Sequence, residues 1–425
     1  MTNGNQHIPS GYKPSPLGII PEDWEVKRIG DFGKVITGNT PPTEDTDNYG
    51  NAYKFVSPAD ISDSKYIEAT EKHLSEKGFS ISRQMPKGTV LFTCIGSTIG
   101  KCAIANESLT SNQQINAIIC NSKHSGEFLY YELSHRSNRI KQIAGEQAVP
   151  IINKSTFENY KVLCPPFEEQ KSIAKILSVW DTAIAKQTAL IEQLTLRKRG
   201  LMQQLLTGKK RLKGFEGEWK ELRLGEIGMF LSNNTLSRDQ LNPEKGEVQN
   251  VHYGDVLIKY PSILDCSKTV LPFINESAYK DSMTDYVKDG DIIISDTAED
   301  ETVGKACEIQ KLGNKKVLAG LHTMLLRPKD GVFAPFFLGY YFNSEKYHSK
   351  LLPLIQGIKV CSIGKQAIQN TIIEVPSIKE QTAIASVLVN ADKEIEIQKQ
   401  KLAAMQEQKK GLMQVLLTGK KRINK

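Results

Sequence analysis

The chain has 425 residues, of which 39% are hydrophobic and 24% charged, with a formal net charge of +7 and seven cysteines. Its length predicts two to four domains, and its composition excludes a largely disordered protein. We see no apolar run of about 18 residues for a membrane span, no export signal, and no C-x-x-C pair for zinc. We therefore expect a reducing, cytoplasmic location, no membrane partner, and a charge that permits a polyanionic ligand.

The first long region, 20–160, contains short apolar runs bounded by turn residues. TVLFTCI at 89–95 and NAIIC at 116–120 predict buried or half-buried strands. The segment 126–144 is the best candidate for a helix. This region is therefore predicted to be a mixed α/β module.

The next segment, 164–212, has a heptad pattern that predicts one long helix with an apolar seam. At about 1.5 Å per residue, roughly 40 residues would span about 60 Å. Pro166 precedes the pattern and Gly208 follows it, which is typical of a helix start and of a left-handed C-terminal cap. Polar residues interrupt the seam at Gln187 and Lys198. The seam residues expected here are Ile173, Leu177, Trp180, Ile184, Ile191 and Leu194.

A second divergent region, 215–372, has the same character as the first. DIIISD at 291–296 and VLAGLHTMLLRP at 317–328 predict strands, and 335–356 predicts a helix.

The last segment, 375–423, repeats 164–212 without a gap at an offset of 211 residues, which joins Gln170 to Gln381. Pro376 and Gly419 stand at its two ends, and its seam is interrupted at Gln398 and Lys409. The seam residues expected here are Ile384, Leu388, Ile395, Leu402 and Met405.

The two divergent regions also begin alike, with WEVKRIGDFG at Trp24 and WKELRLGEIG at Trp219. A tandem duplication explains both similarities. Two apolar seams of this length need a partner, so we expect the repeats to pair with each other antiparallel. The predicted fold is α+β: two globular mixed α/β domains (1–163 and 213–374) separated by two long antiparallel coiled-coil helices (164–212 and 375–425), with an internal pseudo-two-fold repeat.

Two segments come close to catalytic motifs without meeting their requirements. GSTIGK at 96–101 has three residues between its glycines and a cysteine after its lysine, whereas a phosphate-binding loop has four and a Ser or Thr. CPPF at 164–167 resembles the N/D-P-P-F/Y/W box of amino-methyltransferases, but a cysteine is a poor acceptor for the target amine. The histidines are scattered, and none forms H-E-x-x-H. We therefore predict no catalytic residues and no metal site.

Over nearly the whole chain, a series of motifs is similar to those of the specificity subunit of type I restriction-modification systems. They are GIIPEDWEVKRIGD at 18–31, ITGNTPP at 36–42, GSTIGKCAI at 96–104, SNQQINAI at 111–118, HYGD at 252–255, and the PFEEQKSIAKIL and LLTGKKR ends of the helices.

The resemblance implies a sequence-specific binder of double-stranded DNA, with one target-recognition domain for each half of a bipartite site and the helices as a spacer. It also implies two modification (methyltransferase) subunits bound to the helical region, and motor-nuclease restriction subunits as optional further partners. S-adenosylmethionine, ATP and Mg²⁺ would then belong to the partner subunits, and no cofactor to this chain.

Family resemblance and loop placement together select candidate DNA contacts, because Asn, Gln, Arg and His are natural readers of base edges and lysines bind phosphates. In the first region they are Asn39, Thr40, Ser97, Thr98, Lys101, Asn112, Gln113 and Gln114. In the second they are Asn233, Asn234, Thr235, His252, Tyr253, Lys259, Lys305, His322 and Lys359. The basic clusters at 209–211 and 420–422 fit a phosphate, a partner subunit or the C-terminal dipole of the preceding helix equally well.

Two other functions stay open from the sequence. One is a stand-alone DNA methyltransferase or nuclease with degenerate motifs, which transfer of a labelled methyl group by the purified chain alone would reveal. The other is a scaffolding protein that uses only its helices, although such a protein has no need for two divergent modules.

Overall fold

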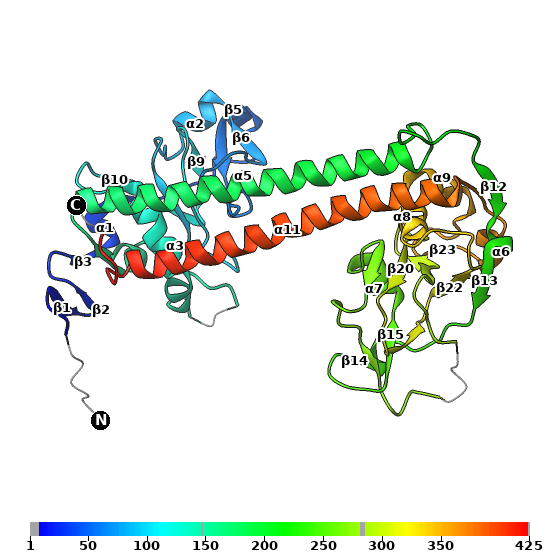
Figure 1. The fold of residues 1–425 in the computed structure, drawn as a ribbon. Coiled ribbons are helices and arrows are strands. Elements are labelled where there is room, and N and C mark those ends of the chain that lie inside the picture. Colours follow the sequence, from blue (N-terminus) through cyan, green and yellow to red (C-terminus); the bar gives the residue numbers. More distant parts are fainter. Residues whose placement is uncertain (1–7, 146–147, 281–284, 424–425) are drawn as a thin grey trace. The chain divides into compact units, whose positions relative to one another are not determined.

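The computed structural model describes residues 8–145, 148–280 and 285–423, and it divides into two compact units. The first unit consists of residues 1–188 and 400–425, and the second of residues 189–399. Each unit is a mixed α/β module with one half of each long helix, α5 (Phe167–Leu205) and α11 (Ile378–Leu416), drawn green and orange to red in Figure 1. The four predicted segments instead divide the chain at the helix ends. Their residues 1–7, 146–147, 281–284 and 424–425 lie outside the described residues.

The first module contains an antiparallel sheet of order β4-β10-β7-β8 and a smaller sheet of order β6-β5-β9, in which β5 and β9 are parallel. A hairpin, β1-β2, and the antiparallel pair β3-β11 complete the strands of the module. The strands are β1 (Tyr12–Ser15), β2 (Gly18–Pro21), β3 (Glu25–Arg28), β4 (Gly33–Thr37), β5 (Tyr49–Val56), β6 (Lys72–Leu74), β7 (Val90–Thr93), β8 (Cys102–Ile104), β9 (Thr110–Ser111), β10 (Ile115–Cys120) and β11 (Lys161–Cys164). The helices are α1 (Ile29–Phe32), α2 (Glu76–Ser80), α3 (Gly126–Gln142) and α4 (Lys154–Glu158).

The larger sheet of the first module is buried on both faces. Along β7, Val90 and Phe92 pack into the core that contains Trp24, whereas Leu91 packs into a second core. Successive strand residues point to opposite faces, so a strand covered on both faces is apolar at every position. This explains why the run 89–95 that predicted the strand is apolar on both faces, interrupted only by the buried Thr93.

The second module has sheets of order β13-β22-β18-β20-β16 and β14-β17-β15-β21, together with the antiparallel pairs β12-β24 and β19-β23. Its strands are β12 (Lys220–Arg223), β13 (Gly228–Leu231), β14 (Leu241–Asn242), β15 (Val248–Val251), β16 (Ile263–Asp265), β17 (Phe273–Ile274), β18 (Ile292–Ser295), β19 (Thr297–Ala298), β20 (Ala306–Gln310), β21 (Lys316–Ala319), β22 (Thr323–Pro328), β23 (Cys361–Ser362) and β24 (Ile372–Val375). Its helices are α6 (Leu224–Ile227), α7 (Tyr253–Ile258), α8 (Phe337–Phe342), α9 (Glu345–Leu351) and α10 (Lys365–Gln369).

Two elements predicted in the second region are broken in the structure. The apolar run 317–328 forms two strands, β21 and β22, because the chain turns at His322, whose φ of 54° is left-handed. The predicted helix 335–356 is two short helices, α8 and α9, because Ser344 caps a new helix through a hydrogen bond from the Tyr347 backbone amide.

The long helices pair antiparallel within each unit. In the first unit, Ile173 at the start of α5 shares a core with Leu416 at the end of α11. In the second unit, Leu205 at the end of α5 shares a core with Ile384 near the start of α11. Each helix has 39 residues, and every predicted seam residue is buried or half-buried. Gly208 and Gly419, with φ of 72° and 70°, take the predicted left-handed conformation.

Gln170 and Gln381, which the repeat pairs, make the same contacts in their two units. Gln170 donates to the Pro165 carbonyl (2.8 Å) and accepts from the backbone amide of Ser125, the N-cap of α3 (2.9 Å). Gln381 donates to the Pro376 carbonyl (2.9 Å) and accepts from the Ala334 amide (2.9 Å), just before α8. Each glutamine therefore joins the start of a long helix to its own module.

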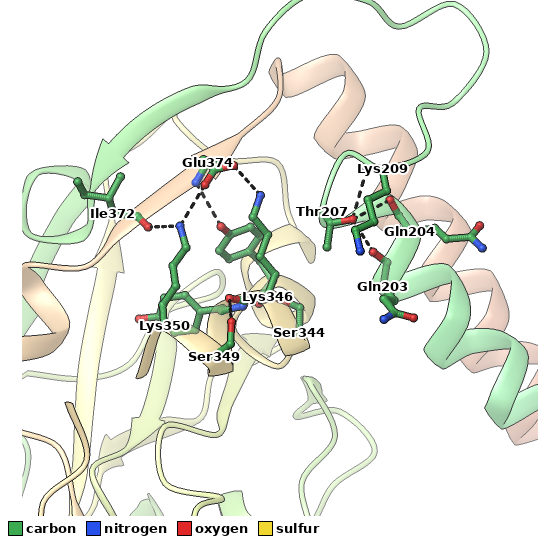
Figure 2. Close-up of polar contacts among 12 residues, drawn as sticks. Gln203, Gln204, Thr207, Lys209, Ser344, Lys346, Ser349, Lys350, Ile372 and Glu374 are labelled. Atoms are coloured by element: carbon green, nitrogen blue, oxygen red, sulfur yellow. Dashed lines mark hydrogen bonds and ion pairs between the residues drawn. The ribbon is translucent and has the colours of Figure 1, made fainter. Parts of the chain in front are cut away.

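Ion pairs fix β24, the strand that leads into α11. In the second unit, Glu374 of β24 accepts hydrogen bonds from Lys346 (2.7 Å) and Lys350 (3.2 Å) of α9, as Figure 2 shows. The bond from Lys346 is the main cause that lowers the pKa of Glu374. At the end of α5, the Thr207 hydroxyl donates to the Gln203 carbonyl (2.6 Å). The strand before α11 and the last turn of α5 are thus both held by polar contacts.

Candidate nucleic-acid interface

Five of the residues predicted to contact DNA in the first module lie together on two adjacent loops. Asn39 and Thr40 follow β4, and Asn112, Gln113 and Gln114 precede β10, which pairs with β4. The Thr40 hydroxyl donates to the Gln113 side chain (2.8 Å), and Asn112 donates from its side chain to that of Gln114 (3.0 Å). The side-chain oxygen (Oδ1) of Asn39 accepts from the Arg83 backbone amide (2.7 Å). Backbone and side-chain bonds therefore hold these amides in a defined loop, with Gln113 exposed at its edge.

The loop 96–101 lies next to this cluster, because the Cys94 amide donates to the Gln114 carbonyl (2.8 Å). Ser97 is exposed and Thr98 half-exposed. Lys101 instead donates to the carbonyls of Pro58 (3.3 Å) and Ile61 (2.7 Å). Its ammonium group therefore ties two loops of the module together, a role that the sequence pattern did not indicate.

Both divergent regions contain a Gly-Lys pair, Gly100-Lys101 and Gly304-Lys305. Lys305 makes a contact similar to that of Lys101. Its ammonium group donates to the Leu257 carbonyl (2.6 Å), and burial lowers its pKa. The Gly-Lys pair that the two regions share thus has a structural function in both, and contact with DNA by either lysine stays a prediction.

The predicted asparagines of the second module differ in their exposure. Asn234 is only 5% exposed; its amide donates to Asn250 (2.9 Å) and to the Ala319 carbonyl (2.9 Å). Asn233 is exposed and donates to the Gly320 carbonyl (3.1 Å), and Thr235 is exposed. Asn234 therefore supports the turn at 319–322 from inside, while its neighbours stand at the surface.

Three aromatic side chains of the second module form a row. The ring centres of His252 and Tyr253 lie 4.6 Å apart, and those of Tyr253 and His322 lie 5.2 Å apart with the rings nearly perpendicular. His252 is buried and caps α7 by accepting from the Gly254 amide (3.2 Å); burial, followed by the charge of Arg238, lowers its pKa. His322 is exposed, and its Nδ1 contacts the Thr297 hydroxyl (3.2 Å) and Asp296 (3.4 Å). With Nδ1 occupied, Nε2 is the ring atom left for a ligand.

Lys259 lies beside this row and forms an ion pair with the buried Asp255 (3.0 Å), which Arg238 also contacts (2.7 Å). Burial on its own would raise the pKa of Asp255, but the hydrogen bonds from Arg238 and Lys259 outweigh it and leave that pKa lowered. Arg238 was not among the predicted residues, although its position a few residues after Asn233 to Thr235 was a usable signal. Lys359 is exposed on the hairpin that contains β23.

Gln114 and His322 occupy the same place in the two modules. The Gln114 carbonyl accepts from the Cys94 amide after β7 (2.8 Å), and the His322 carbonyl accepts from the Asp296 amide after β18 (3.1 Å). Each residue directly precedes a central strand, β10 or β22. A shared backbone thus presents two different side chains at one position, an arrangement suited to reading two different sequences.

The described residues contain no group of three or more His, Cys, Asp or Glu side chains that could hold a metal ion. No helix in the described part of the chain is long and apolar enough to cross a membrane. All seven cysteines are free thiols.

The family model of the type I restriction modification DNA specificity domain matches the chain twice, at residues 21–196 and 216–407. The MjaVIII type I restriction enzyme specificity subunit of Methanocaldococcus jannaschii is 27% identical over 95% of this chain and 94% of its own length. The HindI specificity subunit of Haemophilus influenzae is 31% identical over 35% of this chain and 33% of its own length.

Two solved structures share the fold. A chain from a type I restriction-modification system, studied for its complex assembly and conformational transition, superposes with a TM-score of 0.61 at 18% identity, covering 94% of this chain and 99% of its own. The type I S subunit of M. genitalium gives a TM-score of 0.54 at 15% identity, covering 92% and 96%.

A repeated mixed α/β module joined to long paired helices is therefore the fold of type I S subunits. The chain belongs to the family of type I restriction-modification DNA specificity proteins and carries the family's domain twice. The predicted family, fold class and internal repeat are confirmed. As a subunit that provides DNA sequence specificity, it has DNA and the other subunits of a type I restriction-modification complex as its partners.

Proposed function

We propose that the chain is the non-catalytic subunit that reads a bipartite DNA target, with one half-site for each module. The observation that carries this proposal is the pair Gln114 and His322, which stand on equivalent backbone beside polar side chains that differ between the modules. A glutamine reads adenine best, whereas a histidine offers a different hydrogen-bonding pattern in the major groove. The half-sites should therefore differ in sequence.

The partners in this proposal are two modification subunits, bound along α5 and α11, and optional motor-nuclease restriction subunits. S-adenosylmethionine, ATP and Mg²⁺ belong to these partners, and the complex acts in the cytoplasm, where free thiols persist. Ser97, Thr235 and Lys359 are exposed and Asn39 is half-buried. In this proposal they contact the DNA backbone or the bases that flank those read by Gln114 and His322, the two reading positions.

Methylome sequencing of cells that express the chain with a modification subunit tests the proposal. The expected result is methylation at a gapped motif with two unlike halves. Substitution of Gln114→Ala should alter only one half of this motif, and His322→Ala only the other. An ungapped motif, or one in which Gln114→Ala changes both halves, would contradict the proposal. The purified chain alone, given a labelled methyl donor and DNA, should transfer no label.

In this proposal the helices also set the gap between the half-sites. A seven-residue insertion after both Gln187 and Gln398 preserves both heptad patterns and lengthens each helix by about 10 Å. Since base pairs are stacked about 3.4 Å apart, the gap should grow by about three base pairs while both half-sites stay unchanged. An unchanged gap would contradict the spacer role. A sham insertion after exposed Gly214, outside the helices, serves as the control.

A further inference from the structure

The second module carries a hairpin with an exposed apolar tip. The hairpin runs from Gln356 to Ser362, which exchange two backbone hydrogen bonds of 2.8 and 2.9 Å. At its tip, Ile358 is 98% exposed and Val360 is 58% exposed, with Lys359 between them. Gly357 has a φ of 98°, and a Cβ there would lie 2.0 Å from the Val360 carbonyl oxygen, so the tight turn requires glycine. The turn thus presents Ile358 outward.

The base of this hairpin is joined to the reading position of its module. Strand β23 pairs with β19, and the Ile363 amide donates to the Asp296 carbonyl (2.9 Å). Asp296 in turn donates from its backbone to His322, and Thr297 contacts the His322 ring. A ligand that touches the His322 ring is therefore within reach of the hairpin.

The first module has an apolar edge at the equivalent place. Exposed Val149 and Ile151 lie on a segment that pairs with the loop 94–98: the Gly96 amide donates to the Pro150 carbonyl (2.9 Å), and Ile152 donates to Cys94 (2.8 Å). Cys94 also donates to Gln114. Single exposed apolar residues are ordinary, but an exposed pair next to the reading position of both modules indicates a common use.

We propose that these apolar tips, Ile358 with Val360 and Val149 with Ile151, are wedges that enter a groove of the bound duplex and partly unstack a base step. This inference rests on the proposed function, because it takes duplex DNA as the ligand of the reading positions. Proteins that deform DNA commonly insert Ile, Leu, Met or Pro between base steps. Lys359 stands where it can meet a phosphate beside the step that Ile358 opens.

The charges around the hairpin limit how DNA approaches it. Glu299, Asp300 and Glu301 are exposed and follow β19 directly. Because carboxylates repel phosphates, the loop 299–301 would face the edges of the bases and not the DNA backbone. There an acidic side chain can accept a hydrogen bond from the N4 amino group of cytosine. The backbone phosphates would then pass on the side of Lys359. This orientation places the apolar tip within the groove.

Fluorescence of 2-aminopurine, which rises on unstacking, provides the test. The full chain in complex with a modification subunit is bound to DNA duplexes that contain the motif found by methylome sequencing. In a series of duplexes, 2-aminopurine replaces one base at a time in the second half-site. The wild-type complex should raise the fluorescence at one base step. Ile358→Ala should abolish most of the rise and weaken binding by about tenfold, as expected when a fully buried isoleucine is lost. Ile358→Met, which keeps an apolar wedge, should retain the rise.

A matched control separates the wedge from general surface effects. Val360→Ala should reduce the rise, whereas Val270→Ala, the same change at a 77% exposed valine outside the hairpin, should leave it unchanged. Both sites are exposed, so neither change threatens folding. Val149→Ala should act only on the first half-site.

Three outcomes overturn the inference. The first is tight binding of the motif by the wild-type complex without any rise in fluorescence. The second is a rise and an affinity that Ile358→Ala leaves unchanged. The third is loss of the modification subunit from the Ile358→Ala complex, which would make the tip a protein-docking site. If the wild-type complex selects no sequence at all, the proposed function fails, and the inference fails with it.

Discussion

Lys409 of α11 forms an ion pair with Asp181 of α5 at a seam position where the heptad pattern favours an apolar side chain. The Tyr131 hydroxyl of the first module donates to the same carboxylate, and the ammonium group lies 5.7 Å from the Tyr131 ring centre. Burial and this hydrogen bond raise the pKa of Tyr131. The interruption of the seam is therefore a three-residue polar network that joins both helices to the module.

The second unit contains the same network, made by Lys198, Asp392 and Tyr340. Lys198 lies 2.5 Å from Asp392, the Tyr340 hydroxyl donates to Asp392 (2.6 Å), and Lys198 lies 5.3 Å from the Tyr340 ring centre. Since the two networks come from the two copies of one repeat, each specifies how the two helices pair within its unit.

Removal of either charge should destabilise the helix pairing. In a double-mutant cycle of Asp181→Ala and Lys409→Ala, we expect a coupling energy of about 1 kcal/mol or more, because both side chains are largely shielded from water. The measurement is the free energy of unfolding of the four variants in urea. The control is Glu407 with Lys410, an exposed pair on the same helix, whose coupling should be close to zero. Equal couplings for the two pairs would contradict a specific role of the network.

The long helices and the buried strands could be predicted because their signals are local. Heptads, flanking prolines and cap glycines lie within one segment, and an apolar run such as 89–95 is explained by its own burial. The Asp181–Lys409 pair could not be predicted in this way, because it joins residues 228 positions apart. The only signal for it was that the seam interruptions recur at matching positions in the two repeats.

The direction of the loop side chains was harder to predict than the fold, and the DNA contacts chosen from them stay predictions. A loop lysine such as Lys101 looks the same in sequence whether its ammonium group meets a phosphate or the carbonyls of Pro58 and Ile61. Asn234 lies inside because of contacts with Asn250 and Ala319, which other parts of the chain provide. Loop direction depends on such distant contacts, and one sequence does not reveal them.

The segment that follows α11 is bound to the start of α5 in the first unit through Arg422. Arg422 makes two hydrogen bonds to Glu169 (2.9 and 2.8 Å), and Glu169 accepts from the Trp24 indole (3.0 Å). In the second unit, Arg211 makes the same bidentate contact with Glu380 (2.5 and 2.6 Å). The arginines of the two basic clusters thus pair with carboxylates at the starts of the long helices.

Arg422→Gln should therefore loosen only the first unit, by about 1.5–3 kcal/mol, as for hydrogen bonds to a charged group. Amide hydrogen exchange should become faster in β3 and β11, with little change in β12 and β24. Arg211→Gln should give the reverse pattern, so each variant serves as the control for the other. Arg422→Lys should not restore protection, because lysine cannot make the bidentate contact. Equal effects on both units would contradict this assignment.

Asp255 makes the second module sensitive to acid. The pKa of Asp255 is lower in the folded protein than the ordinary pKa of a carboxyl group, which is about 4. Its ion pairs therefore stabilise the fold fully at pH values above about 4. This stabilisation is lost as the pH falls through the folded pKa. Asp255→Asn should thus be less stable than the wild type at pH 7 by about 1–3 kcal/mol, and the difference should shrink below about pH 4. Urea unfolding of both proteins at pH 7, 5 and 3.5 measures it; a difference independent of pH would refute the role of the carboxylate.

If His322 reads DNA as proposed, its effects on stability and on reading can be measured separately, because its backbone is strained while its ring is exposed. A non-glycine residue in the left-handed region is strained by about 1 kcal/mol or more, so His322→Gly, at a φ of 54°, should leave the stability equal or higher. The same change should remove discrimination at one base pair, worth about 1–3 kcal/mol, from the second half-site only. Methylome sequencing and thermal unfolding of the variant measure the two effects. The control is Lys311→Gly, at a φ of 55°, which relieves similar strain and should leave the motif unchanged. A His322→Gly variant that is less stable and still reads the full motif would show that the ring serves the fold and not the DNA.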